Sequence, residues 1–117
     1  MTYALDSNII SYLLRDNPVV YENYDKAMTD GNRCIIPPVA YYETKRGLLF
    51  SRATTKADDF EMLCRELGVG DMSVSVWNEA ARLYTDHRQK GQPIEDADLL
   101  IAAFCITNDY KIGRAHV

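Results

Sequence analysis

One stretch near the C-terminus, residues 94–108, limits most strongly what this chain can fold into. It reads Ile-Glu-Asp-Ala-Asp-Leu-Leu-Ile-Ala-Ala-Phe-Cys-Ile-Thr-Asn, and residues 99–106 are apolar on every side of a helix. A helix without a polar face is normally covered by other elements, so we expect an enclosed helix here. Its first turn nevertheless carries Glu95, Asp96 and Asp98, and a buried carboxylate is costly unless its charge is compensated. These acids therefore serve either as helix caps or as ligands.

The spacing of the acids separates the two roles. With Asp96 as the N-cap, Asp98 takes the second helical position, and residues two apart differ by roughly 200° around a helix. Both side chains therefore cannot face one pocket from a regular helix. We assign the cap to Asp96 and the pocket to Asp98. The alternative, in which both acids only start the helix, stays open.

Length and composition describe one globular domain. The 117 residues suffice for a single modest core, and the net charge of −4 argues against a surface that coats nucleic acid in general. A local basic patch can still hold a few phosphates. The three cysteines are scattered in apolar surroundings and the sequence has no Cys-x-x-Cys pair, no basic leader and no stretch that spans a bilayer. We therefore expect a cytoplasmic protein with reduced thiols and no membrane association.

Strand and helix signals alternate along the rest of the chain. Strands are expected at residues 1–5, 33–36, 71–74 and from 110, and helices at about 9–14, 18–29, 39–50, 54–67, 75–90 and 97–108. The inward-facing stripes are expected to be Tyr21, Tyr24 and Met28; Phe60, Leu63, Cys64 and Leu67; and Trp77, Ala81 and Tyr84. This order predicts an α/β fold of three layers, α/β/α, with a central parallel sheet.

An acid follows the first strand directly. Asp6 lies at the carboxyl end of that strand, which is the edge where open α/β sheets place their ligands. Ser7 and Asn8 come next, and both are good cap types. In the alternative interpretation, Asp-Ser-Asn is simply a helix start.

A second acid lies on the third helix. Glu43 falls at an interval of four from both Val39 and Gly47, so the three share a face. A glycine inside a helix costs roughly 1 kcal/mol against alanine, and close approach by another group is its usual compensation. Gly47 can thus leave space beside Glu43 for backbone, metal or substrate. The alternative is an ordinary pair of Glu43 with Arg46, three residues on.

Basic residues gather around the end of the same helix. They are Lys45, Arg46, Arg52 and Lys56. Such a group is either a solvated face or a set of contacts to a phosphate backbone.

Asp6, Glu43 and Asp98 lie on three separate elements that parallel topology brings toward one edge of the sheet. Oxygen ligands without His or thiolate select a hard cation, Mg²⁺ or Mn²⁺. Such a metal polarises a phosphodiester and lowers the pKa of a bound water, so we predict hydrolysis by metal-activated water. The sequence has no Ser-His pairing, glycine-rich phosphate loop or Gly-x-Ser-x-Gly elbow for the competing templates.

Three segments together resemble the main motifs of PIN-domain ribonucleases, in particular the VapC toxins of bacterial type II toxin–antitoxin systems. They are residues 3–8 (Tyr-Ala-Leu-Asp-Ser-Asn), 38–48 (Pro-Val-Ala-Tyr-Tyr-Glu-Thr-Lys-Arg-Gly-Leu) and 96–103 (Asp-Ala-Asp-Leu-Leu-Ile-Ala-Ala). The resemblance implies that Asp6, Glu43 and Asp98 coordinate Mg²⁺ or Mn²⁺, supported by Ser7, Asn8 and Asp96. Ser7 replaces the usual Thr of the family and keeps its hydroxyl. The resemblance also implies an RNA substrate, often tRNA or ribosomal RNA, a VapB-type antitoxin and a homodimer.

The end of the chain departs from this family. The family continues past a strand at Tyr110 with a Thr-x-Asn segment, a further acid and a last strand, whereas this sequence reads Ile-Gly-Arg-Ala-His-Val over residues 112–117. We expect an incomplete PIN domain at residues 1–111 and a non-native tail at 112–117. Residues 111–117 can be back-translated as AAG ATC GGA AGA GCA CAC GTC, which contains a common sequencing-adapter string. The hypothesis predicts a truncated gene and weakened metal binding and cleavage.

Two other functions remain open from the sequence. One is a catalytically impaired PIN-like domain that serves only as an interaction partner. The other is a phosphoacceptor receiver domain, which would have paired acids directly after the first strand, whereas Asp6 stands alone there and Glu43 lies on a helix.

Overall fold

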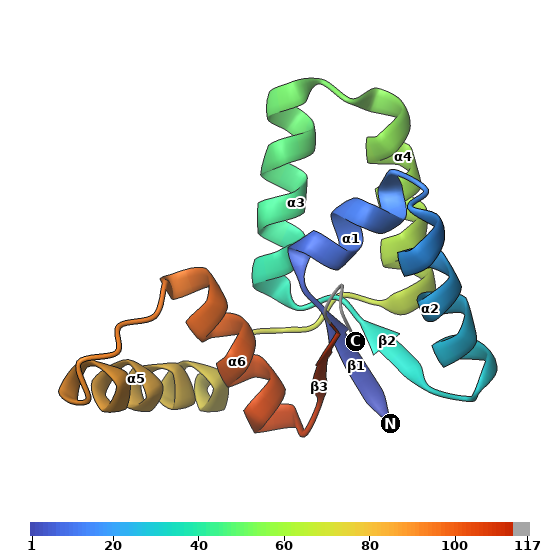
Figure 1. The fold of residues 1–117 in the computed structure, drawn as a ribbon. Coiled ribbons are helices and arrows are strands. Elements are labelled where there is room, and N and C mark those ends of the chain that lie inside the picture. The colour runs from blue at the N-terminus through green and yellow to red at the C-terminus, as the bar shows by residue number, and fades with distance from the viewer. Residues whose placement is uncertain (114–117) are drawn as a thin grey trace.

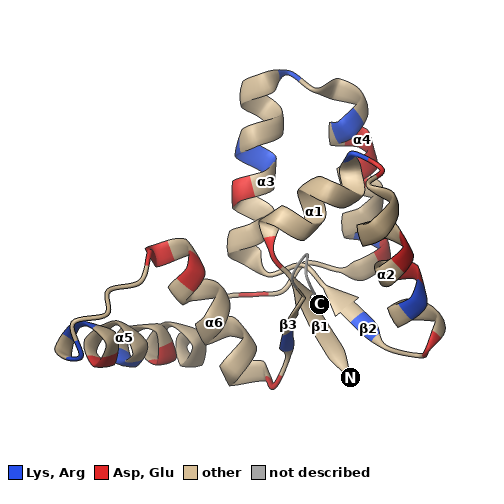
Figure 2. Cartoon of the chain, viewed as in Figure 1, with Lys and Arg blue, Asp and Glu red and all other residues tan. Residues whose placement is uncertain are grey.

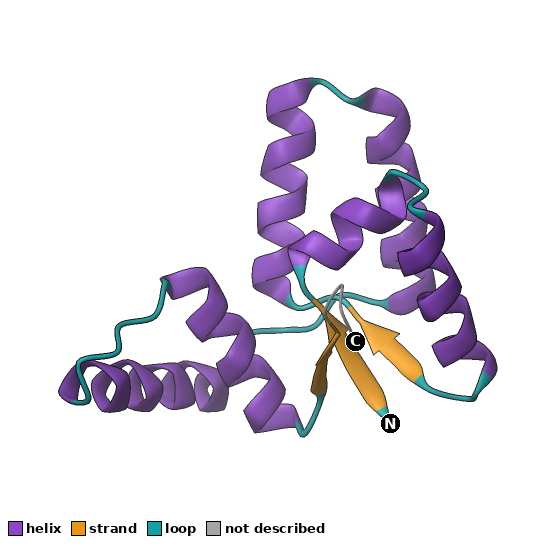
Figure 3. Ribbon diagram, viewed as in Figure 1, coloured by secondary structure: helices purple, strands orange, loops and turns teal. Residues whose placement is uncertain are grey.

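A computed structural model describes residues 1–113 and shows a three-stranded parallel sheet with six helices in that part of the chain (Figures 1 and 3). In chain order the elements are β1 (Thr2–Leu5), α1 (Ser7–Leu14), α2 (Pro18–Thr29), β2 (Arg33–Ile35), α3 (Pro38–Ser51), α4 (Thr54–Leu67), α5 (Val74–Gln89), α6 (Asp96–Asn108) and β3 (Lys111–Gly113). The strand order is β2-β1-β3, with Tyr3 paired to both Cys34 and Lys111. The predicted α/β class with a central parallel sheet is confirmed.

The helices fall into two groups around the sheet. α1, α3 and α4 lie together beyond the end of β1, and α2 lies beside β2 (Figure 1). α5 and α6 pack on each other beside β3, so their hairpin forms the opposite flank. The central strand β1 therefore delivers its last residues to the point where α1 begins.

The core is built where these groups meet the sheet. Its fully buried side chains include Ala4 of β1, Ile10 of α1, Phe60 of α4 and Val76 of α5. Because the buried residues form one apolar cluster, the helices on both flanks share a single core.

Local signals set most helix ends as predicted. Pro18 and Pro38 each occupy the first position of a helix, where their missing amide costs nothing. Asn17 caps α2, because its side-chain oxygen accepts the amides of Val19 and Val20 at 3.1 and 3.2 Å. Gly68 ends α4 with a φ of 84°, a conformation that side chains other than glycine rarely adopt. These boundaries are confirmed.

The strand expected at residues 71–74 is wrong. Within residues 1–113, no strand forms between α4 and α5. Val69 makes an isolated parallel bridge with Ile36, and α5 begins at Val74. The N-cap of α5 is Ser73, two residues before the expected helix start, and its hydroxyl oxygen accepts the Val76 amide at 3.3 Å. Capping of the helix start therefore prevails over the extended tendency of the short valine-containing segment.

The predicted inner faces of two helices are also wrong. Trp77 is 52% exposed and Tyr84 44% exposed, whereas Val76 and Ala80 of α5 are buried. In α2, Tyr21 and Met28 are exposed, Tyr24 is half-buried, and the buried residue is Val20. Each helix carries two apolar stripes one position apart, about 100° of rotation, and packing selects the one with the smaller side chains. The stripe of α4 is confirmed, with Phe60 buried and Leu63, Cys64 and Leu67 half-buried against the core.

The remaining expectations concern thiols, membranes and the chain end. Cys34, Cys64 and Cys105 are free thiols as expected, and burial raises the pKa of Cys105 to about 11. Among the described residues, no helix combines the length and apolarity needed to cross a membrane. Ile112 and Gly113, assigned to the tail, pair with Ala4 and Leu5 in the sheet. Residues 114–117 of that tail lie outside the described residues, and its coding origin stays a prediction.

Candidate active site

Asp6 joins β1 to α1 and is already engaged in the fold. It is the N-cap of α1, with extended backbone angles of φ −73° and ψ 168°, and its Oδ1 accepts the Ile9 amide at 2.8 Å. The alternative interpretation of Asp6 as a helix start is therefore correct for one of its carboxylate oxygens, Oδ1. In the described part of the chain Oδ2 makes no hydrogen bond or ion pair. The half-buried carboxylate can thus cap the helix and still offer one oxygen to a ligand.

Glu43 lies directly against the start of α1. The Ser7 hydroxyl donates a hydrogen bond to Glu43 Oε1 at 3.2 Å, which joins segments 36 residues apart. The alternative pair with Arg46 also exists, but its Nη2 lies 3.9 Å from Oε2, at the limit of an ion pair. Because the Arg46 side chain is 59% exposed, that pair contributes little. The Ser7 contact therefore defines the position of Glu43.

A cavity opens next to this contact. It has a volume of about 440 Å³ and lies between α1, α3 and the start of α4. Its lining consists of Ser7, Ser11, Leu14, Arg15, Glu43, Thr44, Arg46, Gly47, Leu48, Ser51, Ala53 and Lys56. A Cβ built on Gly47 would meet no atom within 4 Å, so the space predicted beside Glu43 is open.

Asp98 is placed differently from the sequence expectation. The N-cap of α6 is Glu95 and makes no side-chain cap bond, so Asp96 is the first helical residue and its predicted role as cap is wrong. Glu95, Asp96 and Asp98 are all exposed. The apolar run is buried as predicted at Leu99, Ile101, Ala103, Phe104 and Cys105, although Ile106 is 55% exposed. Only the later turns of α6 are enclosed, so the acids need neither partners nor caps to offset burial.

The structure brings two of the three predicted acidic segments together. Figure 2 shows acidic residues at the start of α1, on α3 and at the start of α6, and α3 packs against α6. Within the described chain Asp98 makes no hydrogen bond or ion pair to Asp6, Ser7 or Glu43. Asn8 is exposed, and the supporting roles of Asn8 and Asp96 stay predictions.

The chemistry of the acids suits a hard cation, but their arrangement does not form its site. Carboxylates on three elements without His or thiolate are the donors that Mg²⁺ and Mn²⁺ prefer. Over residues 1–113, however, no three His, Cys, Asp or Glu side chains are grouped to hold a metal ion. In this arrangement the residues therefore do not fit a cation bound by Asp6, Glu43 and Asp98 together.

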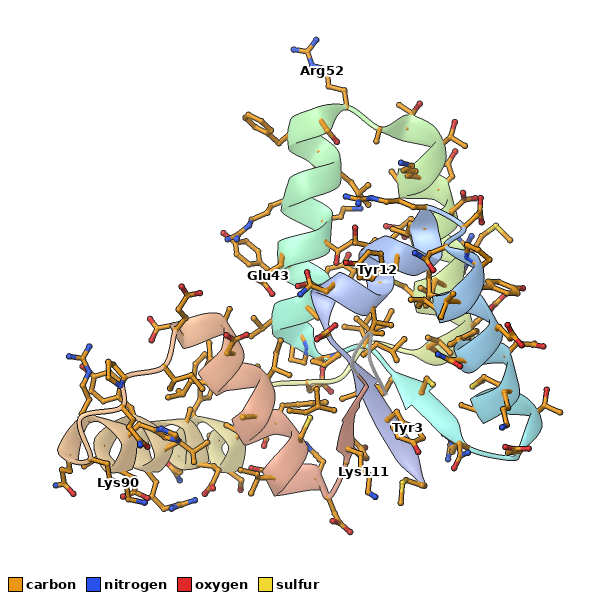
Figure 4. The ribbon with its side chains drawn as sticks, in the orientation of Figure 1. Tyr3, Tyr12, Glu43, Arg52, Lys90 and Lys111 are labelled. Carbon is orange, nitrogen blue, oxygen red and sulfur yellow. The ribbon has the colours of Figure 1, made fainter. Side chains whose placement is uncertain are left out.

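The basic candidates divide into three kinds. Lys45 is committed to a 2.8 Å ion pair with Glu61, whose hydrogen bond and charge raise the pKa of Lys45 and lower that of Glu61. Arg52 is the left-handed C-cap of α3 and points away from the body of the molecule (Figure 4). Arg46 and Lys56 line the cavity, which leaves them as candidates for phosphate contacts.

Among the basic residues of the cavity lining, sequence reasoning missed Arg15. It follows Ser7 and Ser11 at intervals of four, so the three lie on one face of α1 and at its end. That spacing was visible in the sequence and would have identified Arg15 once Ser7 was taken as a site residue.

Comparison with known proteins concerns the family and the fold of the chain. The sequence model of the PIN domain matches residues 3–112. Ribonuclease VapC2 of Rickettsia felis is 27% identical over 110 residues, 93% of this chain and 82% of that protein. The fold also matches that of a chain in the crystal structure of VapBC2 from Rickettsia felis bound to a DNA fragment from their promoter, with a TM-score of 0.85, 25% identity, and 96% and 85% of the two chains covered.

Two further solved structures share the fold. VapBC-1 from nontypeable Haemophilus influenzae matches with a TM-score of 0.81 and 23% identity, over 96% of this chain and 84% of that chain. DNA-bound VapBC from Salmonella typhimurium matches with a TM-score of 0.83 and 17% identity, over 97% of each chain. At these identities the likeness concerns the fold.

The fold and the site define a parallel α/β domain whose half-buried acids gather where the central strand ends, the usual ligand edge of such sheets. The chain belongs to the PIN-domain family. This membership replaces the receiver-domain alternative.

Proposed function

We propose that this chain is an endoribonuclease that acts as the toxin of a toxin–antitoxin pair and hydrolyses RNA phosphodiesters. The observation that carries the proposal is the 3.2 Å hydrogen bond from Ser7 to Glu43, which joins two family motifs next to Asp6. Membership of the PIN-domain family and the similarity to a ribonuclease named VapC2 support it. tRNA or ribosomal RNA is the proposed substrate class.

The chain's own residues have distinct proposed roles. Asp6, Glu43 and Asp98 are the acids on which cleavage depends, and Ser7 positions Glu43 through its hydroxyl. The bond from the Ile9 amide to Asp6 Oδ1 fixes the rotamer of that carboxylate, so its second oxygen is held for use. Asn8 and Asp96 support the two helix starts.

The proposed cofactor is Mg²⁺ or Mn²⁺. Such an ion, when bound, would polarise the phosphodiester and activate water. Because Asp6, Glu43 and Asp98 are not grouped as ligands in this arrangement, binding by all three requires them to come closer together.

Cleavage by purified protein tests the proposal. We expect Asp6→Asn, Glu43→Gln and Asp98→Asn each to lower the rate of RNA cleavage about 100-fold or more, and EDTA to abolish it. Asp58→Asn, at an exposed position on α4, is the matched control and should retain the parent rate. Circular dichroism of each variant separates lost catalysis from lost folding, which matters most for Asp6 because it caps α1.

The same cleavage experiment distinguishes the enzyme from a second candidate, a PIN-like domain without catalytic activity. The exposed, ungrouped position of Asp98 favours that candidate. If nuclease-free preparations of the parent neither cleave RNA with Mg²⁺ or Mn²⁺ nor arrest growth when expressed alone, the enzyme proposal is wrong.

We propose two protein partners in the cytoplasm, a VapB-type antitoxin and a second copy of this chain. The antitoxin is supported by the three solved structures of similar fold, which are structures of VapBC complexes. The dimer is supported by large exposed apolar side chains on α3 and α5, namely Tyr42, Leu49, Phe50, Val74 and Trp77. Light scattering should give twice the chain mass, and co-expressed antitoxin should relieve growth arrest. A monomer at micromolar concentration, or arrest that the antitoxin leaves unchanged, would contradict the respective partner.

A further inference from the structure

The cavity beside Glu43 is basic in a chain that is acidic overall. Arg15 from the end of α1, Arg46 from α3 and Lys56 from the first turn of α4 line it, against one acid, Glu43. Three cations less one acid leave two positive charges, whereas the whole chain carries −4. Figure 2 shows basic residues on both α3 and α4, the helices that pack with α1 around this space. A local reversal of charge sign points to an anionic ligand.

Two of these cations, Arg15 and Lys56, make no ion pair in the described residues. Arg46 lies over the Tyr42 ring, with its Cζ 5.1 Å from the ring centroid, and its nearest carboxylate oxygen, on Glu43, is 3.9 Å away. Other cations of the chain are committed to ion pairs, since Lys45 on α3 binds Glu61 at 2.8 Å and Arg82 on α5 bridges Glu79 and Asp86. The cavity therefore holds uncompensated positive charge from three separate elements.

The neutral part of the lining also has free hydrogen-bonding capacity. Thr44 Oγ1 is buried and, in the described part of the chain, has no hydrogen-bond partner. Buried hydroxyls are nearly always satisfied, so this unpaired hydroxyl of a cavity-lining residue is exceptional. Gly47 leaves the neighbouring helix surface open to close approach.

We propose that Arg15, Arg46 and Lys56 form a phosphodiester-binding subsite that holds the RNA strand beside the reacting bond. This inference rests on the proposed function, because Ser7 and Glu43 form one end of the same cavity. Arg binds phosphate oxygens through two parallel hydrogen bonds and Lys acts as a point charge. The volume of about 440 Å³ lies within the 300–1,000 Å³ that binding pockets usually have.

The distribution of the cations favours a phosphate backbone over an acidic peptide. A nucleic-acid strand carries one charge at every nucleotide, so successive phosphates need cations on successive elements. Arg15, Arg46 and Lys56 are supplied in this way by three different helices. A strand seated on them reaches Glu43 without crossing another acid of the cavity lining.

Binding measurements that do not depend on cleavage test the subsite. In an Asp98→Asn background with EDTA, the affinity for a labelled single-stranded RNA of twelve nucleotides is measured by fluorescence anisotropy at 50 and 200 mM NaCl. We expect Arg15→Gln and Lys56→Gln each to weaken binding about tenfold and to lower the salt dependence by about 0.7 per lost phosphate contact. A DNA strand of the same sequence should lose affinity to the same extent, because the subsite contacts phosphates.

Arg65→Gln is the matched control. Arg65 is exposed and lies nine residues from Lys56 on α4, so the two differ by about 180° around that helix. This variant removes the same charge from the opposite side and should stay within about twofold of the parent, because a single distant charge adds only a screened term. Arg15→Lys, which keeps the charge, should restore the salt dependence. Thermal melting identifies any variant that fails to fold.

Three results would overturn the subsite. The first is that Arg15→Gln and Lys56→Gln bind RNA as Arg65→Gln does. The second is that these variants bind RNA with unchanged affinity and differ from the parent only in that inorganic phosphate no longer competes with the RNA. The third is that they weaken binding of a glutamate-rich peptide but not of RNA. Failure of the proposed function is distinguishable, since it appears as absent cleavage in a parent protein whose RNA binding still depends on Arg15.

Discussion

The two halves of the candidate site are held in very different ways. At the start of α1, Asp6 and Ser7 are fixed by hydrogen bonds to Ile9 and Glu43, within a group of helices that pack on one another. At the start of α6, Asp98 is exposed and makes no such bond in the described residues, and α6 packs chiefly on α5. One acid pair is thus preorganised by the body of the domain, and the third acid is carried by a hairpin on the opposite flank.

This contrast teaches where precision in the site comes from. Sites on elements whose side chains are locked by packing and hydrogen bonds are held more closely than sites without such support. The short β3 strand and the apolar face of α6 connect the hairpin to the sheet, while the Ser7–Glu43 bond connects α1 directly to α3. Assembly of a three-acid site therefore depends on how the α5–α6 hairpin packs against the sheet and the helices α1, α3 and α4.

Truncation of buried aromatic side chains should have the largest effect on the free energy of unfolding, and it tests most directly whether the two regions differ. Phe60 of α4 packs on Tyr41, and Phe104 of α6 packs on Tyr110, each with ring centroids 5.6 Å apart. We expect Phe60→Ala and Phe104→Ala each to lower the free energy of unfolding by about 3–5 kcal/mol. Chemical denaturation measures this, with Val19→Ala, at a 63% exposed position of α2, as a control that should change it by less than about 0.5 kcal/mol.

Hydrogen exchange on the same variants locates the damage. Phe104→Ala should raise amide exchange in α5 and α6 before α1 and α3, because Phe104 contacts Tyr110, between α6 and β3, and Gly70, in the segment that leads into α5. Equal loss of protection throughout the chain would mean that the two regions open as one unit, and the distinction drawn above would fail.

A smaller effect is expected at the preorganised half. Ser7→Ala removes the hydroxyl that donates to Glu43, so we expect the rate of RNA cleavage to fall about tenfold with little change in KM. Ser7→Thr should recover most of the rate, because it keeps the hydroxyl. Ser75→Ala, on the exposed side of α5, is the control and should cleave as the parent does. Equal losses in Ser7→Ala and Ser7→Thr would show that packing, not the hydrogen bond, matters at this position.

The same division explains how much could be predicted from the sequence. The choice of Asp6 and Glu43 as site residues and most helix boundaries follow from local signals. These are the end of a strand, an interval of four residues along a helix, and the prolines at positions 18 and 38. Which stripe of α5 faces inward is not local, since Trp77 and Val76 lie on adjacent stripes and only packing against α6 selects one. The exposure of Asp98 is not local either, because it depends on how the α5–α6 hairpin packs against the rest of the domain. The contact between the Phe104 ring and Gly70 likewise follows only from the three-dimensional structure.

The smallest predicted effect compares thiols on the two regions. Cys34 on β2 and Cys105 on α6 are both buried, and burial raises the pKa of each thiol, for Cys105 to about 11. Both therefore react with a thiol reagent at pH 8 only when the surrounding structure opens, since the thiolate is the nucleophile. If the hairpin opens independently, Cys105 is labelled severalfold faster than Cys34. Mass spectrometry of the labelled chain measures the order, and Cys34 reacting first would mean that the β1–β2 pairing yields before the hairpin does.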